Sequence, residues 1–246
     1  MVILSINILN LQRVTLSRLL IIRIVRAMMF DIWKQFKQIL FTAAGMLVIA
    51  PTLAQVKKAP PATPVHHPSS TQLKEFFVLA AQANVTFVYP KGFREIPAPD
   101  DEDFSYDYAL ELPGKNFEMW FQVKSEKEDW FNYIRTQNSR TSQMANPDSV
   151  YNTLGKALAT AFTGDQQYFQ TVIPPDVLAR YNADAGKSYL LTLLDLDQTK
   201  HYKYALLITL QKYHTGTIVA VCFTNEKGPE FFKNIKKASN CLKFKP

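Results

Sequence analysis

The residues of this sequence that could do chemistry are two cysteines, four histidines and several closely spaced acids. Cys222 lies in the apolar run 219–223, and Cys241 lies near the end of the chain. In an exported protein such a pair predicts a disulfide, which would enclose a loop of about twenty residues and stabilise the fold by about 3 kcal/mol. A buried free thiol would pack equally well at Cys222. The sequence leaves both interpretations open.

His201 precedes the apolar stretch 202–223 and His214 lies in the turn within it, and we expect them to lie at neighbouring strand ends and to approach one another. A metal site built on them would need a carboxylate as the third ligand, and Asp195 and Asp197 are the acids nearby. A hydrolase would instead use one of these histidines as a general base beside an acid. Ordinary exposed turn histidines are the simpler interpretation, so the sequence predicts neither a metal nor another cofactor.

Other signatures of catalysis are missing from the sequence. Its eight glycines are too few to favour a glycine-rich phosphate loop, and no Gly-x-Ser-x-Gly elbow of a serine hydrolase is present. The acidic run 100–103 lacks the alternating ligands and central glycine of a calcium loop, so we expect a solvated loop. His66 and His67 lie in a proline-rich stretch with no third ligand nearby. The sequence therefore assigns no catalytic residue and favours a protein that is not an enzyme.

The formal net charge of +7 is distributed unevenly along the chain. Residues 1–54 contain six basic residues and one acid, which leaves 22 basic and 20 acidic residues in the remainder. No block of lysines and arginines with interleaved aromatics is left there to follow a phosphate backbone. The sequence therefore predicts no nucleic-acid partner.

Residues 28–54 have the organisation of a secretory signal peptide. Lys34 and Lys37 precede an uncharged apolar stretch of twelve residues, and Ala54 ends a small-residue motif before Gln55. The apolar stretch is shorter than the roughly 20 residues of a spanning helix. We expect cleavage before Gln55 and a periplasmic or secreted protein with no stable membrane span. An uncleaved anchor is the alternative.

The segments on either side of this signal have different compositions. Residues 1–27 are apolar but contain four arginines, which make a spanning helix unfavourable. A basic amphipathic helix on a membrane surface would fit them, but an upstream extension before a true start at Met28 or Met29 is the simpler interpretation. Residues 55–70 are proline-rich and are predicted to form a solvated tether. Residues 71–246 are predicted to form a single α+β domain.

The predicted sheet is organised around residues 202–223, two apolar strands joined at a His-Thr-Gly turn. Alternating apolar and polar residues over 104–112 and 117–124 predict a second antiparallel hairpin. Residues 85–89 and 187–196 are also strand-like because they are rich in β-branched, aromatic and aliphatic side chains.

Two helices are predicted from apolar residues at three- and four-residue steps. The first runs from Asp148, expected to be its N-cap, to Gly164, and the second covers 229–238. A short helix is expected over 71–83. Residues 125–147 are polar with scattered aromatics and are expected to be a connection with one helical turn.

This order of strands, helix, strands and helix resembles that of PsbP-like domains. The run from Phe87 to Phe93 is similar to the opening strand of that family, with an aromatic strand, then Pro90, then Gly92 before an aromatic. The hairpin and closing helix, 202–238, are similar to the family's second half. The resemblance implies an α/β/α sandwich that acts as a binding or assembly module. It transfers no site residue, and the export signal and tether indicate a bacterial periplasmic or surface protein rather than a photosynthetic role.

These features together predict an exported, non-catalytic binding or assembly module of the bacterial cell envelope. Its partner would be an envelope protein or a small ligand, held on the sheet or the loops. The alternative is an exported hydrolase of unrecognised type, in which His201 or His214 converges with an acid on a nucleophile. A third hypothesis is a protein held at a membrane by an uncleaved 28–54.

Overall fold

The structure is a computed structural model that describes residues 70–137, 144–164 and 168–246. These residues belong to one compact unit. The predicted extension 1–27, the signal peptide 28–54 and all of the tether except its last residue lie outside the described residues. None of the described helices is long and apolar enough to cross a membrane.

The described residues form five α-helices, one 3-10 turn and nine strands. The helices are α2 (Thr71–Gln82), α3 (Lys127–Thr136), α4 (Val150–Thr163), α5 (Pro175–Arg180) and α6 (Pro229–Ala238), with a 3-10 turn η1 (Pro147–Ser149) before α4. The strands are β1 (Val85–Phe87), β2 (Arg94–Ile96), β3 (Tyr108–Glu111), β4 (Phe117–Ser125), β5 (Phe169–Val172), β6 (Ala185–Thr192), β7 (Tyr204–Lys212), β8 (Gly216–Thr224) and β9 (Leu242–Phe244).

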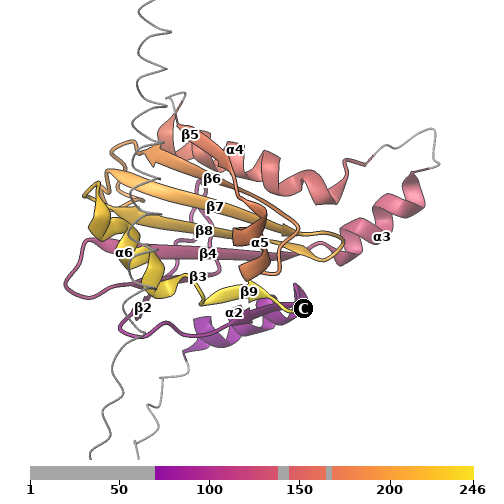
Figure 1. The fold of residues 1–246 in the computed structure, drawn as a ribbon, viewed down its shortest axis with the longest axis horizontal. Coiled ribbons are helices and arrows are strands. Elements are labelled where there is room, and N and C mark those ends of the chain that lie inside the picture. Colours follow the sequence, from indigo (N-terminus) through magenta and orange to yellow (C-terminus); the bar gives the residue numbers. More distant parts are fainter. Residues whose placement is uncertain (1–69, 138–143, 165–167) are drawn as a thin grey trace, which may run out of the picture. The chain divides into compact units, whose positions relative to one another are not determined.

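Seven of these strands form one antiparallel sheet in the order β2-β3-β4-β8-β7-β6-β5 (Figure 1). β8 lies at its centre and pairs along its whole length with β4 on one side and β7 on the other. The residues of β8 are buried almost throughout, because both faces of the sheet are covered there. The predicted hairpin within 202–223 is confirmed as β7–β8, and the predicted pairing of 104–112 with 117–124 is confirmed as β3–β4.

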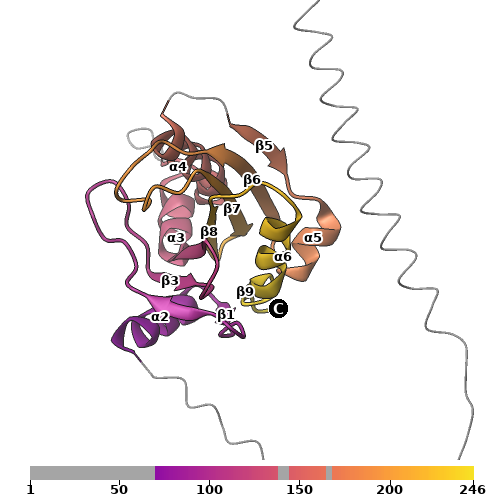
Figure 2. The same cartoon turned by 90° about the vertical axis from the view of Figure 1, so that its left-hand side faces the viewer.

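Helices cover both faces of this sheet (Figure 2). On one face, Phe162 of α4 packs in a core with Trp120 of β4. On the other face, α2, α5 and α6 contribute Phe76, Leu178 and Phe231 to a second core. Burying one such large apolar side chain contributes about 1.5–3 kcal/mol, so each helix is held mainly by its apolar face. The fold is therefore α+β with three α/β/α layers, as the sequence predicted.

β1 does not join this sheet. It pairs with β9 in a separate two-stranded sheet, in which Val85 lies opposite Phe244. The predicted strand over 85–89 is thus shorter than expected, and the seven-stranded sheet begins with β2. Both ends of the domain are tied together by this pairing, because β1 follows the first described helix and β9 closes the chain.

α4 confirms the helix predicted up to Gly164, whose φ of +63° suits a glycine at the helix end. Its N-terminus differs from the prediction. Asp148 lies within η1, and the residue that precedes α4 is Ser149, which makes no side-chain capping bond. The carboxylate of Asp148 instead accepts a hydrogen bond from the backbone N–H of His214. Asp148 is therefore not the N-cap of α4, because the β7–β8 turn takes its carboxylate.

Residues 125–147 contain the whole of α3 and not the single helical turn that was expected. Glu128 and Asp129 lie in its first turn, where their charges interact favourably with the helix dipole. None of the ten residues of α3 is buried. Trp130, Tyr133 and Ile134 do recur at three- and four-residue steps, so the sequence held a helical signal that the prediction of a connection overlooked.

Candidate functional site

The two histidines lie at opposite ends of β7, so the expectation that they approach one another is wrong. His201 precedes the strand and His214 lies in the turn that follows it. The nine residues of β7 separate them, at about 3.3 Å per residue. A hairpin brings its two open ends together, but these histidines flank a single strand of it.

His201 is held between two carboxylates in the loop after β6. Its Nδ1 lies 2.7 Å from Oδ1 of Asp195, and its Nε2 lies 3.2 Å from Oδ1 of Asp197. The hydrogen bond and charge of Asp195 raise the pKa of His201, with a smaller contribution from Asp197. Both ring nitrogens face acids, so neither is left to accept a proton from a nucleophile. The arrangement does not support the hydrolase hypothesis.

The Asp195–His201 pair borders an open hollow of about 490 Å³. The side chains of His201 and Asp195 are 62% and 84% exposed, respectively. Charges so exposed interact weakly through water and salt, and they are engaged with one another. The hollow therefore shows neither the burial nor the converging free polar groups of an active site.

His214 packs against α3 and η1 at the other end of β7. Its ring stacks on Trp130 with 3.7 Å between ring centroids, and its Nε2 lies 3.2 Å from Oδ2 of Asp148. Trp130 is therefore a packing residue on the β7–β8 turn. This contact fixes α3 to the sheet although α3 buries none of its own side chains.

A buried polar network lies beneath this turn. Glu126 is 1% exposed, and its carboxyl lies 2.8 Å from the Thr217 hydroxyl and 3.1 Å from Nε2 of Gln211. The Thr217 hydroxyl also lies 2.6 Å from Oε1 of Gln211, which closes a ring of three contacts. The single hydroxyl proton of Thr217 and one amide proton of Gln211 can serve only two of them. A protonated Glu126 carboxyl would supply the third proton, and burial favours that form because it raises the pKa of Glu126.

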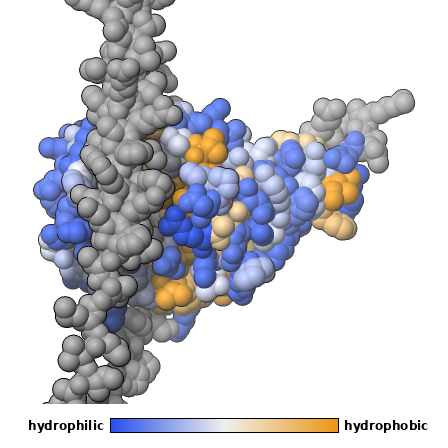
Figure 3. Space-filling view, in the orientation of Figure 1, coloured by the Kyte–Doolittle hydropathy of each residue, from blue (hydrophilic) through white to orange (hydrophobic). Residues whose placement is uncertain are grey.

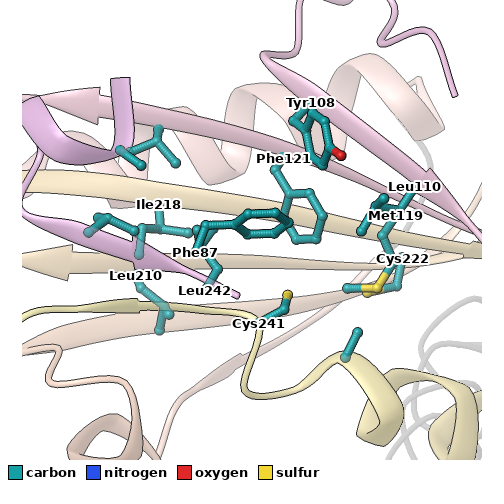
Figure 4. Close-up of a cluster of buried hydrophobic side chains, with 14 of the residues drawn as sticks. Phe87, Tyr108, Leu110, Met119, Phe121, Leu210, Ile218, Cys222, Cys241 and Leu242 are labelled. Carbon is teal, nitrogen blue, oxygen red and sulfur yellow. The ribbon is translucent and has the colours of Figure 1, made fainter. Parts of the chain in front are cut away.

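The two cysteines line one apolar crevice between the sheet, α6 and β9 (Figure 4). Cys222 of β8 and Cys241 are both buried and carry free thiols in this structure. Burial raises the pKa of Cys241 to about 12 and raises the pKa of Cys222 further, so neither is a reactive thiolate. The crevice has a volume of about 50 Å³, well below the roughly 300 Å³ of a small-molecule site. The disulfide between the two cysteines stays a prediction.

A row of apolar side chains runs from this crevice across the sheet to its edge. The register places Cys222 opposite Leu206, Leu206 opposite Leu190, and Leu190 opposite Phe169. Opposite residues of antiparallel strands share a face, so these side chains lie on one side of the sheet. Exposure increases along the row, from buried Cys222 through half-buried Leu206 to 42% at Leu190 and 61% at Phe169.

Half-buried Ile208 of β7 lies on the same face, two residues from Leu206, and it also borders the crevice. We call Phe169, Leu190, Leu206 and Ile208 the open face. Leu206 and Ile208 pack at the margin of the core that α5 and α6 cover, so the open face lies on the side of those helices. Figure 3 shows that apolar patches interrupt an otherwise hydrophilic surface in the view of Figure 1.

The border of the open face along α6 is basic. Ile235 of α6 lines the same crevice as Ile208, while Lys233, Lys236 and Lys237 of this helix are exposed. Residues 201–246 contain eight lysines and two acids, which makes this part of the domain strongly positive. α6, which shares the crevice with Ile208 of the open face, thus carries exposed lysines, of which Lys233 pairs with Glu230.

Among the described residues, no three His, Cys, Asp or Glu side chains gather closely enough to hold a metal ion. His201 contacts both Asp195 and Asp197, but each of its ring nitrogens faces a different carboxylate. The three groups are therefore not arranged around one ion. A metal site that combines His201, His214 and a carboxylate does not form, because His214 lies beyond the far end of β7.

Sequence reasoning missed both the open face and the Glu126 network. Leu190 and Leu206 lie in apolar runs that look like ordinary core strands in the sequence. The signal that could have marked the surface is the uncharged run 169–173 directly before two prolines, which is typical of a sheet edge. No sequence signal links Glu126 to Gln211, because 85 positions separate them.

Comparisons with known proteins bear on the fold alone. No protein-family model matches the chain, and no curated protein is found to be similar to it. Among solved structures, it is similar to the solution structure of cyanobacterial PsbP (CyanoP) from Synechocystis sp. PCC 6803, with 12% sequence identity and a TM-score of 0.38. The match covers 66% of this chain and 88% of that one. This similarity carries no site, activity or family membership over to the chain, whose α+β architecture follows from its own strand order.

Proposed function

We propose that this protein is an exported, non-catalytic binding module of the cell envelope that holds its partner on the open face. The observation that carries the proposal is the exposed cross-strand row of Leu206, Leu190 and Phe169. Single exposed apolar residues are common on soluble proteins, but a contiguous row on a sheet face is typical of an interaction surface.

Burial of the open face would supply the binding free energy. Covering a Leu or Phe side chain contributes about 1.5–3 kcal/mol, so Leu190 and Phe169 together are enough to anchor a partner. The lysines of α6 favour a partner whose apolar side chains are bordered by acids. We therefore expect a protein segment with an apolar stripe beside negative charge.

The remaining parts of the proposal come from the chemistry of the chain. A non-catalytic role is favoured because the histidine nearest to an open hollow, His201, has both nitrogens facing acids. Export is favoured by the composition of 28–54. Sequencing of the N-terminus of the mature protein should begin at Gln55, and a peptide from 28–54 in the mature protein would contradict cleavage.

Site-specific photocrosslinking in intact cells tests the open face. A benzophenone side chain at position 190 should give a discrete adduct with one envelope protein. The matched control is position 194, because Leu194 is 39% exposed and lies in the loop after β6, outside the open face. The adduct from position 190 should disappear with Phe169→Asp and weaken at high salt. Equal labelling from positions 190 and 194, or an adduct that survives Phe169→Asp, would rule out the open face.

A further inference from the structure

The two edges of the seven-stranded sheet are built differently. β2, at one edge, has three residues, of which Arg94 and Glu95 are charged, and Pro97 follows it. The guanidinium of Arg94 also pairs with the carboxylate of Glu111 on β3. Charges, prolines and short length are the features by which proteins prevent edge strands from pairing with other chains. The β2 edge is therefore protected.

β5, at the other edge, is also short, and two prolines follow Ile173, but its four residues, Phe-Gln-Thr-Val, carry no charge. Phe169 and Val172 are 61% and 65% exposed, and the strand carries no charge and no proline. An uncharged edge strand with exposed apolar side chains is a template for pairing with another strand. The contrast with β2 indicates that this edge is an interface.

The backbone of β5 defines which groups are free to pair. The N–H of Ile173 donates to the carbonyl of Gly186 at 3.1 Å, so these two residues form a hydrogen-bonded pair of the β5–β6 ladder. Such pairs alternate along antiparallel strands, so Thr171 and Phe169 also bond to β6. The N–H and C=O groups of Gln170 and Val172 therefore point away from the sheet.

We propose that the free edge of β5 pairs antiparallel with β5 of a second copy of this chain and continues the sheet across a two-fold axis. The inference does not depend on the proposed function. It uses the outward backbone of Gln170 and the side chain of Val172, which lies opposite Lys187 and on the face away from Phe169. The partner surface proposed above lies on the other face and shares Phe169 with this pairing, so the variants that test the pairing leave Phe169 unchanged.

The sequence of β5 is complementary to itself. Residues opposite one another must share a face, so a two-fold axis perpendicular to the sheet can pass through Thr171. Thr171 then lies opposite its own copy, Gln170 opposite Val172, and Phe169 opposite Ile173. Thr–Thr and aromatic–β-branched pairs are favourable across strands, and no charge opposes a like charge. A second copy therefore fits this edge without any change in the strand.

The length of β5 limits the strength of the pairing. A short edge contributes few hydrogen bonds, so we expect a dimer with a dissociation constant in about the micromolar range. Sedimentation equilibrium of the full chain between about 5 and 500 μM should then show a shift from monomer to dimer. A chain that stays monomeric throughout this range would overturn the proposal.

Gln170→Lys tests the edge directly, because an edge lysine opposes pairing. Position 170 lies opposite Tyr189 of β6, so the new charge faces no like charge within the β5–β6 ladder. We expect dimerisation to weaken by at least about tenfold. The matched control is Val88→Lys, since Val88 is 58% exposed and lies beyond β1, outside the sheet. Unchanged dimerisation in Gln170→Lys, or equal loss in both variants, would overturn the pairing.

A cysteine on the axis tests the register without weakening the edge. In Thr171→Cys the two introduced thiols would lie in a non-hydrogen-bonded pair, with Cα atoms about 4.5 Å apart, which is within reach of a disulfide. Mild oxidation should give a covalent dimer, and the buried Cys222 and Cys241 should not compete. Crosslinking of Gln170→Cys alone would support self-pairing with the axis at Gln170. Crosslinking of neither variant, or no more than in Val88→Cys, would exclude β5 pairing with itself.

Discussion

The two ends of β7 each carry a histidine paired with acid, but their surroundings differ. At the turn end, His214 stacks on Trp130 directly above the buried Glu126 network. At the other end, His201 lies between Asp195 and Asp197 in a loop whose side chains are mostly in water. The same residue types therefore form a structural connection at one end and a surface ion cluster at the other.

This difference shows that burial, and not the presence of a charged pair, decides what a polar group contributes. An exposed ion pair typically contributes less than about 1 kcal/mol, because water and salt compete for both charges. A buried polar group left without its partner loses about 1–3 kcal/mol or more. We therefore expect mutational sensitivity to concentrate at the turn end of β7.

The largest effect is expected from Glu126→Ala. The substitution removes the partner of Gln211 and Thr217, which are 0% and 1% exposed, and should lower the free energy of unfolding by about 3 kcal/mol. Urea denaturation measures this change. Glu128→Ala is the control, since Glu128 is exposed in the first turn of the same helix, and it should change stability by less than about 0.5 kcal/mol. Equal effects would show that the network is not what ties α3 to the sheet.

Glu126 should also make stability depend on pH. Burial raises its pKa in the folded protein above the value of 4.5 for an unperturbed glutamate. The hydrogen bonds of Thr217 and Gln211 oppose this shift and lower the pKa, but to a smaller extent than burial raises it. Between the two pKa values the folded state binds more protons than the unfolded state, so the free energy of unfolding falls as pH rises.

Glu126→Gln should flatten this pH dependence, because an amide supplies the missing donor to the ring at every pH. Urea midpoints of the wild type and the variant, measured from pH 4 upward, compare the two directly. The variant should gain stability relative to the wild type as pH rises. Parallel curves would mean that Glu126 titrates like an unperturbed glutamate.

Trp130→Ala should have the next largest effect. It removes the stack on His214, and we expect a loss of about 1–2 kcal/mol, because aromatic pairs contribute beyond their buried area. Phe131→Ala is the neighbouring control, since Phe131 lies on the same helix and is 64% exposed. If both variants lose equal stability, the stack with His214 contributes nothing specific.

The contrast between the two ends also explains what could be predicted from the sequence. The β7–β8 hairpin, the β3–β4 hairpin, α4 and α6 were predictable, because each repeats apolar residues with the period of its own backbone. α3 was missed although Trp130, Tyr133 and Ile134 have helical spacing, because the segment around them is mostly polar. A local sequence pattern identifies a helix or a strand, but it does not show which residues that helix or strand will contact.

The candidate sites depend on such partners. Glu126 meets Thr217 only because β4 and β8 pair in one particular register. Asp148 looked like a helix cap because the helix follows it, yet its carboxylate binds the β7–β8 turn. The open face was hidden for the opposite reason, since Leu190 and Leu206 have core-like sequence contexts. They are exposed because α5 and α6 cover this face of the sheet only in part, and a local sequence pattern does not show which strands a helix will cover.

The smallest effect on stability is expected at His201, where Asp195→Asn should nevertheless shift a pKa. Asp195 contributes most to raising the pKa of His201, so the imidazole should titrate closer to its unperturbed value of 6.5 in this variant. Proton NMR of the imidazole follows the shift, and Asp197→Asn should move the pKa less. A raised histidine pKa stabilises the folded state below about pH 6.5, and this contribution is lost as pH rises through the folded pKa. Well above the folded pKa the imidazole is neutral in both states, so urea midpoints measured there should stay unchanged in both variants. A clear loss of stability in Asp195→Asn would show that this loop is held as firmly as the turn at the other end of β7.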